Sequence, residues 1–331
     1  MQKRRLVFII SAILPVVLFI LDLTFGAVSI PPGDVWKALT GGDIAPTTRA
    51  IVLDIRLLKA VVAVTGGAAL SVSGLQMQTL FRNPLAGPYV LGISSGASLG
   101  VAMFILASPL MTLPKWLSAI GVAGAAWIGA AAILLIISLV GRRIKDIMVI
   151  LILGMMFSSG VSAVVQILQY MSHEDALKSF VIWTMGSLGE VTPMQLWILI
   201  PAVAAGLIMA VAAIKPLNLL LFGEEYAVTM GLDTRRARIL LFVSTTLLAG
   251  SVTAFCGPIG FIGLAIPHVC RMLFYDADHR VLVPASMLTG ASVLLLCDII
   301  SKAFTLPINS ITAILGIPVV VWVVVRNSAR S

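Results

Sequence analysis

Polar side chains interrupt one long apolar stretch of this chain at a spacing that places them on one side of a helix. Within residues 146–169 they are Ser158, Ser159, Ser162, Gln166 and Gln169. Ser158 and Ser162 are four residues apart, as are Ser162 and Gln166, and residues with this spacing share a helix face. Uncharged polar groups suit either a path for a cargo or hydrogen bonds between packed helices. We take Ser158, Ser162, Gln166 and Gln169 as candidates for a translocation path and keep the packing alternative open.

Residue patterns typical of enzymes are missing from the sequence. It contains no G-x-x-x-x-G-K-[ST] phosphate-binding loop, no H-E-x-x-H and no G-x-S-x-G,. Its histidines and cysteines have no metal-binding or redox spacing; they are His173, His268 and His279, and Cys256, Cys270 and Cys297. We therefore expect no catalytic residue, no metal ligand and no cofactor bound by this chain, and we interpret the cysteines as small core residues.

Ionisable groups are rare inside the apolar stretches, and we expect Asp298 to be the exception. Lys302 follows it by four residues, so the two side chains share a helix face and a local ion pair is predicted,. Carriers that are coupled to ion gradients usually bury several ionisable groups in the middle of the membrane. The lack of such a relay argues against proton or sodium coupling and favours an external energy source, such as a partner ATPase.

The segment from Gly223 to Gly231 predicts a short helix between two apolar stretches. Glu224 and Glu225 fall in its first turn, where negative charge stabilises the helix dipole,. Gly231 suits the left-handed position that ends a helix, and Asp233 or Thr234 can cap the helix that follows. A short helix of this kind is a natural contact for a soluble partner, and an ordinary structured loop is the alternative.

Ten apolar stretches, each near the length that spans a bilayer, must position these residues. Apolar residues make up 60% of the 331 residues, charged residues 11%, and the mean hydropathy is +1.09. A membrane solvates such a chain if every stretch forms a helix that satisfies its own backbone. We predict an all-α, polytopic helical bundle that forms a single domain over residues 1–331. The predicted spans are 6–24, 57–76, 91–108, 116–139, 146–169, 194–213, 237–256, 260–274, 282–300 and 309–325.

The net charge of +8 comes from basic residues that follow the positive-inside rule, not from a nucleic-acid surface,. With the amino terminus inside, 15 of the 22 basic residues lie in cytoplasmic segments. This asymmetry predicts an even number of spans and two cytoplasmic termini. The first span follows a basic start and lacks an A-x-A cleavage site, so we interpret it as a retained helix. Residues 25–55 then lie outside, and the loop at about 215–236 lies inside.

Small residues recur every four positions in three of the spans. They are Gly92, Gly96 and Gly100; Gly121, Ala125 and Gly129; and Gly154, Ser158 and Ser162. Such stripes let helix backbones approach closely, so they predict a compact bundle. The short eighth span is preceded by Gly257-Pro258-Ile259-Gly260, an interruption that is tolerated at membrane depth only where protein or a cavity covers it. We expect this segment to be buried.

Four stretches resemble the FecCD-type permease subunits of bacterial ABC importers for ferric siderophores, haem and vitamin B12. The similarity extends over nearly the whole chain. The stretches are Arg56-Leu57-Leu58-Lys59; Gly74 to Gln78 with Asn83 to Ala86 and Leu91 to Ala97; Gly223 to Gly231; and Gly257 to Leu264 with Ile266-Pro267-His268 and Arg271. Each is weak alone, and together they are very specific.

The resemblance implies a homodimer of ten-helix subunits around a central path, two ATPase subunits that bind ATP and Mg, and an extracytoplasmic substrate-binding protein. It implies ATPase docking by Gly223, Glu224, Glu225, Tyr226, Ala227, Met230 and Gly231. It implies binding-protein docking by Arg56, Lys59 and Lys302, although lysine lacks the two-pronged guanidinium that arginine offers, and anchoring of the span ends is the alternative. It implies an architectural role for Gly257, Pro258, Gly260, Gly263, Pro267, His268 and Arg271.

We therefore predict a permease of the bacterial inner membrane that imports a large metal chelate, either an iron(III) siderophore complex or haem, with vitamin B12 as the alternative cargo. A path without fixed charges would not trap such a cargo, and selectivity can reside in the external binding protein. Two other classes remain open. A stand-alone secondary carrier would need an ion gradient and no ATPase, and a membrane scaffold would have no path residue that affects uptake.

Overall fold

A computed structural model of the chain describes residues 2–26, 28–106, 115–141, 144 and 146–328. Parts of the predictions lie outside these residues. They are residues 107 and 108 of the predicted third span, and four of the 15 basic residues assigned above to cytoplasmic segments, namely Arg142, Arg143, Lys145 and Arg330.

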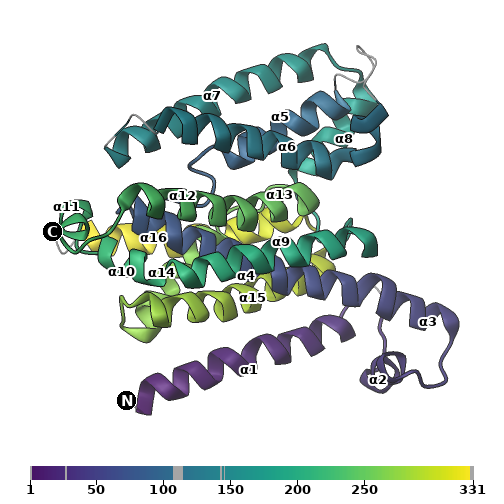
Figure 1. Ribbon diagram of the computed structural model, residues 1–331. Coiled ribbons are helices and arrows are strands. Elements are labelled where there is room, and N and C mark those ends of the chain that lie inside the picture. The colour runs from purple at the N-terminus through teal and green to yellow at the C-terminus, as the bar shows by residue number, and fades with distance from the viewer. Residues whose placement is uncertain (1, 27, 107–114, 142–143, 145, 329–331) are drawn as a thin grey trace.

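Every regular element within the described ranges is a helix. In chain order the elements are α1 (Gln2–Thr24), α2 (Pro32–Thr40), α3 (Pro46–Ala50), η1 (Ile51–Arg56), α4 (Leu57–Leu80), α5 (Ile93–Ile105), α6 (Lys115–Gly141), α7 (Ile147–Met171), α8 (Glu174–Thr184), α9 (Pro193–Ala212), α10 (Ile214–Leu220), α11 (Glu224–Thr229), α12 (Thr234–Thr245), η2 (Thr246–Gly250), α13 (Ser251–Cys256), α14 (Ile262–Phe274), α15 (His279–Phe304) and α16 (Ile308–Ser328). The two η elements are π-helical turns that continue into their neighbours. The start of α1, the end of α16 and α11 lie at one end of the bundle, and α2 and α3 lie at the other (Figure 1).

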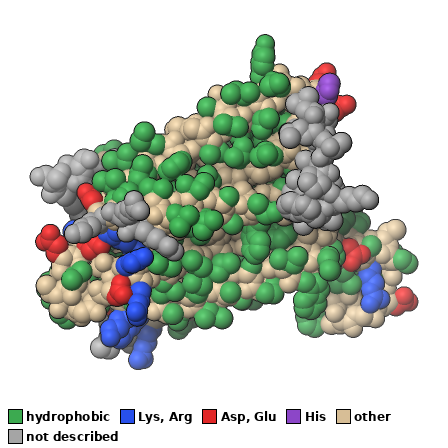
Figure 2. Space-filling view, turned by 45° about the horizontal axis from the view of Figure 1, so that its top comes forward, with side chains coloured by type: hydrophobic (Ala, Val, Ile, Leu, Met, Phe, Trp, Pro, Cys, Tyr) green, Lys and Arg blue, Asp and Glu red, His purple; other side chains and the backbone are tan. Residues whose placement is uncertain are grey.

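The prediction of an all-α membrane bundle is confirmed. Each predicted span coincides with a helix or, at 237–256, with α12, η2 and α13 in succession. Among the described residues, six helical segments are long and apolar enough to cross a membrane; they are Arg4–Thr24, Gly121–Gly141, Ile147–Met171, Pro193–Ala212, Thr234–Cys256 and His279–Phe304. Hydrophobic side chains cover the middle of the face in Figure 2, and charged side chains gather towards its two ends. The number of crossings and the side of each terminus stay predictions.

Helix α4 forms the centre of the bundle. Eighteen of its 24 residues are buried, and it packs against α15, α14, α9 and α12. Glycines allow its backbone to touch two neighbours, because a methyl group at Gly74 would lie 1.8 Å from the carbonyl oxygen of Gly263, and one at Gly67 would lie 2.2 Å from that of Gly290. Any side chain at these crossings would force the helices apart, so α4 is held rigidly.

The predicted small-residue stripes pack α5 against α6 and α7, with one exception. A methyl group at Gly96 would lie 2.5 Å from the Gly129 carbonyl oxygen, and one at Gly154 would lie 2.5 Å from that of Val90. Gly121 was expected to join such a contact, but it has a φ of 64° and interrupts α6 at a kink. Nothing lies within 4 Å of the position where its side chain would be. Its role is conformational, since a positive φ favours glycine.

Three helices outside the predicted spans were missed. Proline occupies the first turn of α2 and of α3, where its fixed φ suits a helix start,. Helix α8 begins with Glu174 and Asp175, acidic residues that favour a helix start,. These signals are visible in the sequence, but they are short and lie between much stronger apolar patterns.

Candidate functional site

The short helix predicted between Gly223 and Gly231 is present as α11. Gly223, with a φ of 106°, precedes it, and Gly231, with a φ of 83°, follows it. Backbone bonds close its end, from the Leu232 N–H to the Ala227 carbonyl at 2.9 Å and from the Gly231 N–H to the Val228 carbonyl at 2.9 Å. The chain therefore enters and leaves α11 through two glycines, which fix it as a separate projecting turn.

Helix α11 faces inward with one small residue and outward with large ones. Ala227 is fully buried, whereas Tyr226, Val228 and Met230 are 51%, 54% and 58% exposed. Of the predicted docking residues, Ala227 thus anchors the helix, and Tyr226 and Met230 are free to contact another protein. Helix α12 follows directly, and the carboxylate of Asp233 caps it by accepting the Arg236 N–H at 3.0 Å, as expected from the sequence.

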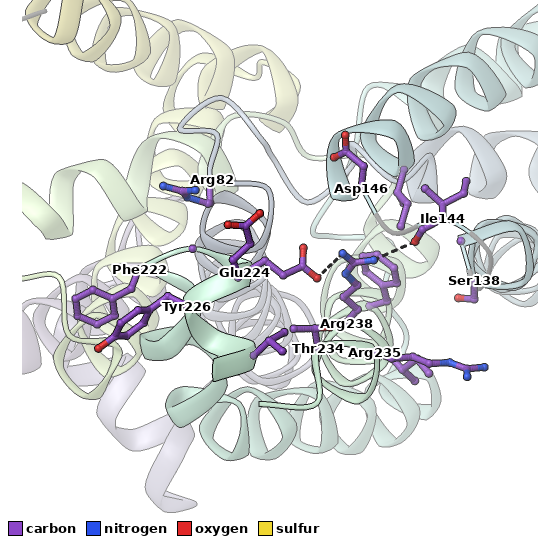
Figure 3. A pocket seen from close by; sticks show the side chains of 17 residues that line it. Arg82, Ser138, Ile144, Asp146, Phe222, Glu224, Tyr226, Thr234, Arg235 and Arg238 are labelled. Carbon is purple, nitrogen blue, oxygen red and sulfur yellow. Dashed lines mark hydrogen bonds and ion pairs between the residues drawn. The ribbon is translucent and has the colours of Figure 1, made fainter. Parts of the chain in front are cut away.

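Arg238 bonds both to α11 and to the segment between α6 and α7. Arg238 on α12 donates from Nη2 to Oε1 of Glu224 at 2.5 Å and from Nη1 to the carbonyl oxygen of Ile144 at 3.2 Å. A cavity of about 1070 Å³ lies beside this bridge, and Arg82, Asp146 and Arg235 also line it. Figure 3 shows Arg238 reaching towards both partners, while Arg235 points away from them. No local pattern in the sequence predicts this bridge, because its three residues lie in separate segments.

A buried polar network holds α10, the helix that leads into α11. Nδ1 of His279 lies 2.7 Å from Oδ1 of Asn218, and its Nε2 lies 2.8 Å from the hydroxyl of Thr79 on α4. Asn218 also donates to Oδ1 of Asp278 at 2.7 Å. The backbone N–H of Arg280 and the Asn218 amide hold the pKa of the Asp278 carboxyl below its ordinary value,. The segment formed by α10 and α11 thus starts from a point that is fixed to α4 and α15.

The glycine-rich motif between α13 and α14 is buried and tightly packed, as expected. A methyl group at Gly257 would lie 2.4 Å from the Trp183 carbonyl oxygen, and one at Gly263 would lie 2.7 Å from that of Leu70. Gly260 donates its N–H to Oδ1 of Asn309 on α16 at 2.9 Å. Pro258 lies in the break itself, and Pro267 is buried inside α14.

The polar end of this motif bonds to α4 and to the turn after it. Nε2 of His268 lies 2.8 Å from the carbonyl oxygen of Pro84, so that nitrogen carries the proton and donates. Arg271 donates to Oε1 of Gln78 at 2.6 Å. These contacts give the residues of the motif a packing and bonding role inside the bundle.

The three basic residues predicted for the outer face are largely turned inward. Arg56 is 4% exposed, and its guanidinium donates to the carbonyl oxygens of Leu23, Thr24 and Val28. The Lys302 side chain is 9% exposed and that of Lys59 is 21% exposed. Lys59 therefore keeps the largest share of its surface for a partner.

Two buried carboxylates neutralise these lysines. The predicted pair is confirmed, because Nζ of Lys302 lies 2.7 Å from Oδ2 of Asp298. The same Nζ lies 2.8 Å from Oδ2 of Asp22 on α1, and Nζ of Lys59 lies 3.3 Å from Oδ1 of Asp298. The expectation that Asp298 is the exception among the spans was wrong, since Asp22 lies in the predicted first span and is fully buried. We call Asp22, Asp298, Lys59 and Lys302 the outer charge cluster.

The predicted path residues on α7 divide into two groups. Ser158 is partly buried, donates to the Gly154 carbonyl at 2.8 Å and lies against Gly92 at the start of α5. Ser162 and Gln166 are exposed, and Gln169 is partly exposed. Ser158 thus fits the packing alternative, whereas Ser162 and Gln166 face outward from this subunit.

Comparisons with known proteins cover nearly the whole chain. The model of the FecCD transport family matches residues 13–326. The vitamin B12 import system permease protein BtuC of Klebsiella pneumoniae is 38% identical, over 99% of this chain and 96% of that protein. The hemin transport system permease protein HmuU of Yersinia pestis is 36% identical, over 98% of this chain and 97% of that protein. A solved metal-chelate type ABC transporter in an inward-facing conformation has a TM-score of 0.82 and 28% identity, over 95% of this chain and 96% of that one.

Proposed function

The chain belongs to the FecCD transport family and is the permease subunit of an ABC importer, and from this premise we propose that it imports a large metal chelate, an iron(III) siderophore complex or haem. The observation that carries the proposal is the match over 95% of this chain to a structure described as a metal-chelate type transporter. The HmuU relative is named for hemin, which is an iron chelate. Vitamin B12 is a second candidate, because the BtuC relatives are named for it.

An ATPase and a substrate-binding protein are the partners of this family. For this chain we propose that α11 docks on the ATPase, which binds ATP and Mg on its own chain. Support comes from the exposed Tyr226, Val228 and Met230 on a helix whose base is fixed by Asn218 and His279. A helix with a large exposed apolar surface, joined to a segment that is fixed to the bundle, can receive a movement from a partner and pass it on.

On the outer face, the structure favours Lys59 as the residue that meets the binding protein. The donor groups of Arg56 and Lys302 form hydrogen bonds within the subunit. These two residues would therefore support the docking surface without contacting the partner.

The path would run along α7 between two copies of this chain in the bacterial inner membrane. Helix α7 has 25 residues, of which four are buried within the subunit. It packs mainly on α5 and less on α6. Its exposed face, with Ser162 and Gln166, is therefore available to a second copy and to a path without fixed charges.

Purification of the tagged chain from its native membrane, followed by mass spectrometry, tests the partners. We expect an ABC ATPase and, after mild crosslinking, a substrate-binding protein. The binding protein recovered in this way would then be titrated with a ferric siderophore, with hemin and with cobalamin. Binding of cobalamin alone would replace the iron proposal by the B12 alternative. Recovery of the chain without partners, even after crosslinking, would favour a stand-alone carrier.

A further inference from the structure

Arg238 contacts two segments that are distant from each other in the sequence. Its side chain is 12% exposed, and it bonds to Glu224 at 2.5 Å on one side and to the carbonyl of Ile144 at 3.2 Å on the other. Glu224 is the first residue of α11. Ile144 lies two residues before Asp146, the residue that caps α7. One guanidinium thus joins the docking helix to the entry of the helix with the candidate path residues.

The Ile144 end of this bridge lies between α6 and α7, where the Ile144 N–H bonds to the carbonyl of Gly141 at the end of α6 at 3.2 Å. The carboxylate of Asp146 accepts the Met148 N–H at 2.8 Å and so caps the first turn of α7,. Few residues of α7 are buried within the subunit, and these include Ile150, Leu151 and Gly154 near the same end. A displacement of Ile144 therefore acts directly on the end of a helix that is held less firmly than α4.

The surroundings of Arg238 leave room for movement. The cavity of about 1070 Å³ separates α11 and the start of α12 from the connection that holds Ile144 and Asp146 (Figure 3). A planar guanidinium holds a carboxylate and a carbonyl in fixed directions at the same time, which a lysine ammonium does less well. The Arg238 side chain thus bonds to two segments on opposite sides of the cavity and holds them at a fixed separation.

We propose that Arg238 is a positioning residue that transmits the movement of α11 to the start of α7. The proposal rests on the proposed role of α11 as the ATPase-docking helix. Movement of α11 shifts the Glu224 carboxylate, Arg238 follows it, and the carbonyl of Ile144 follows Arg238. The outcome is a displacement of the start of α7, the helix that also holds Ser162 and Gln166 further along its length.

The test uses the complete transporter, the chain with its ATPase and binding protein, reconstituted into liposomes. Arg238→Met keeps the length and apolar stem of the side chain and removes its bonds to Glu224 and Ile144. Arg235→Met is the matched control, because Arg235 lines the same cavity from the same helix and points away from Glu224 (Figure 3). The measured quantities are the amount of ATPase bound, the rate of ATP hydrolysis and the cargo taken up per ATP hydrolysed.

We expect Arg238→Met to bind the ATPase and hydrolyse ATP as the wild type does, and to lower uptake per ATP about tenfold, a typical coupling effect. Arg235→Met should match the wild type. Unchanged uptake per ATP in an assembled Arg238→Met complex would overturn the proposal. If that variant does not assemble, Arg238→Lys decides, with an expected loss of about threefold and with wild-type uptake per ATP as the contradicting result. A wild-type complex without ATP-driven uptake would instead refute the proposed function itself.

Discussion

The two ends of the bundle each contain an ion-paired network, and they differ in how much water reaches them. At the outer end, Asp22 and Asp298 are buried and share Lys302, whose side chain is 9% exposed. At the inner end, Glu224 is 33% exposed, and its pair with Arg238 borders a cavity of about 1070 Å³. Buried charges are costly to separate, whereas partly hydrated pairs are cheap to rearrange. The outer network is therefore suited to hold α1, α4 and α15 in place, and we call it the clamp. The inner network is suited to rearrange as α11 moves, and we call it the joint.

The largest expected effect comes from breaking the outer clamp. Asp298→Leu leaves Lys59 without its carboxylate and Lys302 with Asp22 alone, and removal of one partner from a buried ion pair costs about 3–5 kcal/mol. The measurement is the thermal unfolding midpoint of the purified protein in detergent. A midpoint equal to that of the wild type would show that water or lipid headgroups already solvate this cluster.

The matched change at the inner end should cost much less stability. Glu224→Gln removes one charge from a pair that is partly exposed, so we expect a loss of about 1 kcal/mol or less in the same melting experiment. A loss as large as that of Asp298→Leu would remove the distinction between clamp and joint.

Charge reversal on α11 separates docking from folding. Glu224→Lys with Glu225→Lys places two cations in the first turn of a helix that prefers anions there. It also sets one of those cations against Arg238. We expect normal membrane insertion and a fall of about tenfold in transport-linked ATP turnover, equivalent to about 1.4 kcal/mol. Normal turnover in the double variant would refute the docking assignment for α11, and Glu225→Lys alone would separate the contribution of Glu225 from that of Glu224.

The smallest effect is expected at Lys59, the more exposed of the two lysines in the outer charge cluster. Lys59→Gln should weaken binding of the substrate-binding protein about threefold, since a partly exposed charge contributes about 1 kcal/mol or less. The wild-type affinity should fall as salt is raised. Surface plasmon resonance on nanodisc-embedded permease measures both, and Arg49→Gln, on α3 at the same end, serves as the control. Equal affinities for wild type and Lys59→Gln would favour anchoring of the span end over docking.

The sequence predicted those features that depend on local patterns. Apolar runs located the helices, Gly223 and Gly231 marked the limits of α11, and Asp233 was one of the two predicted caps of α12. The pair of Asp298 and Lys302 followed from their four-residue spacing. In each of these cases, residues that are close in the sequence determine the structure.

Features that join distant segments were not predicted. Asp22 meets Lys302 across 280 residues, and His279 meets Thr79 across 200. The bridge from Glu224 through Arg238 to Ile144 also depends on how α6, α7, α11 and α12 are arranged. No local spacing encodes these contacts, and a single buried aspartate in an apolar run resembles an ordinary span end until its partner is known.

Uptake into liposomes that contain the permease with its ATPase and binding protein tests the central claim most directly. ATP is supplied on the side of α11, cargo and binding protein on the side of α2 and α3, and no ion gradient is imposed. The account predicts accumulation of the metal chelate that depends on ATP and on the binding protein and that persists when ionophores are added. Uptake that needs an ion gradient and proceeds without the ATPase would contradict it.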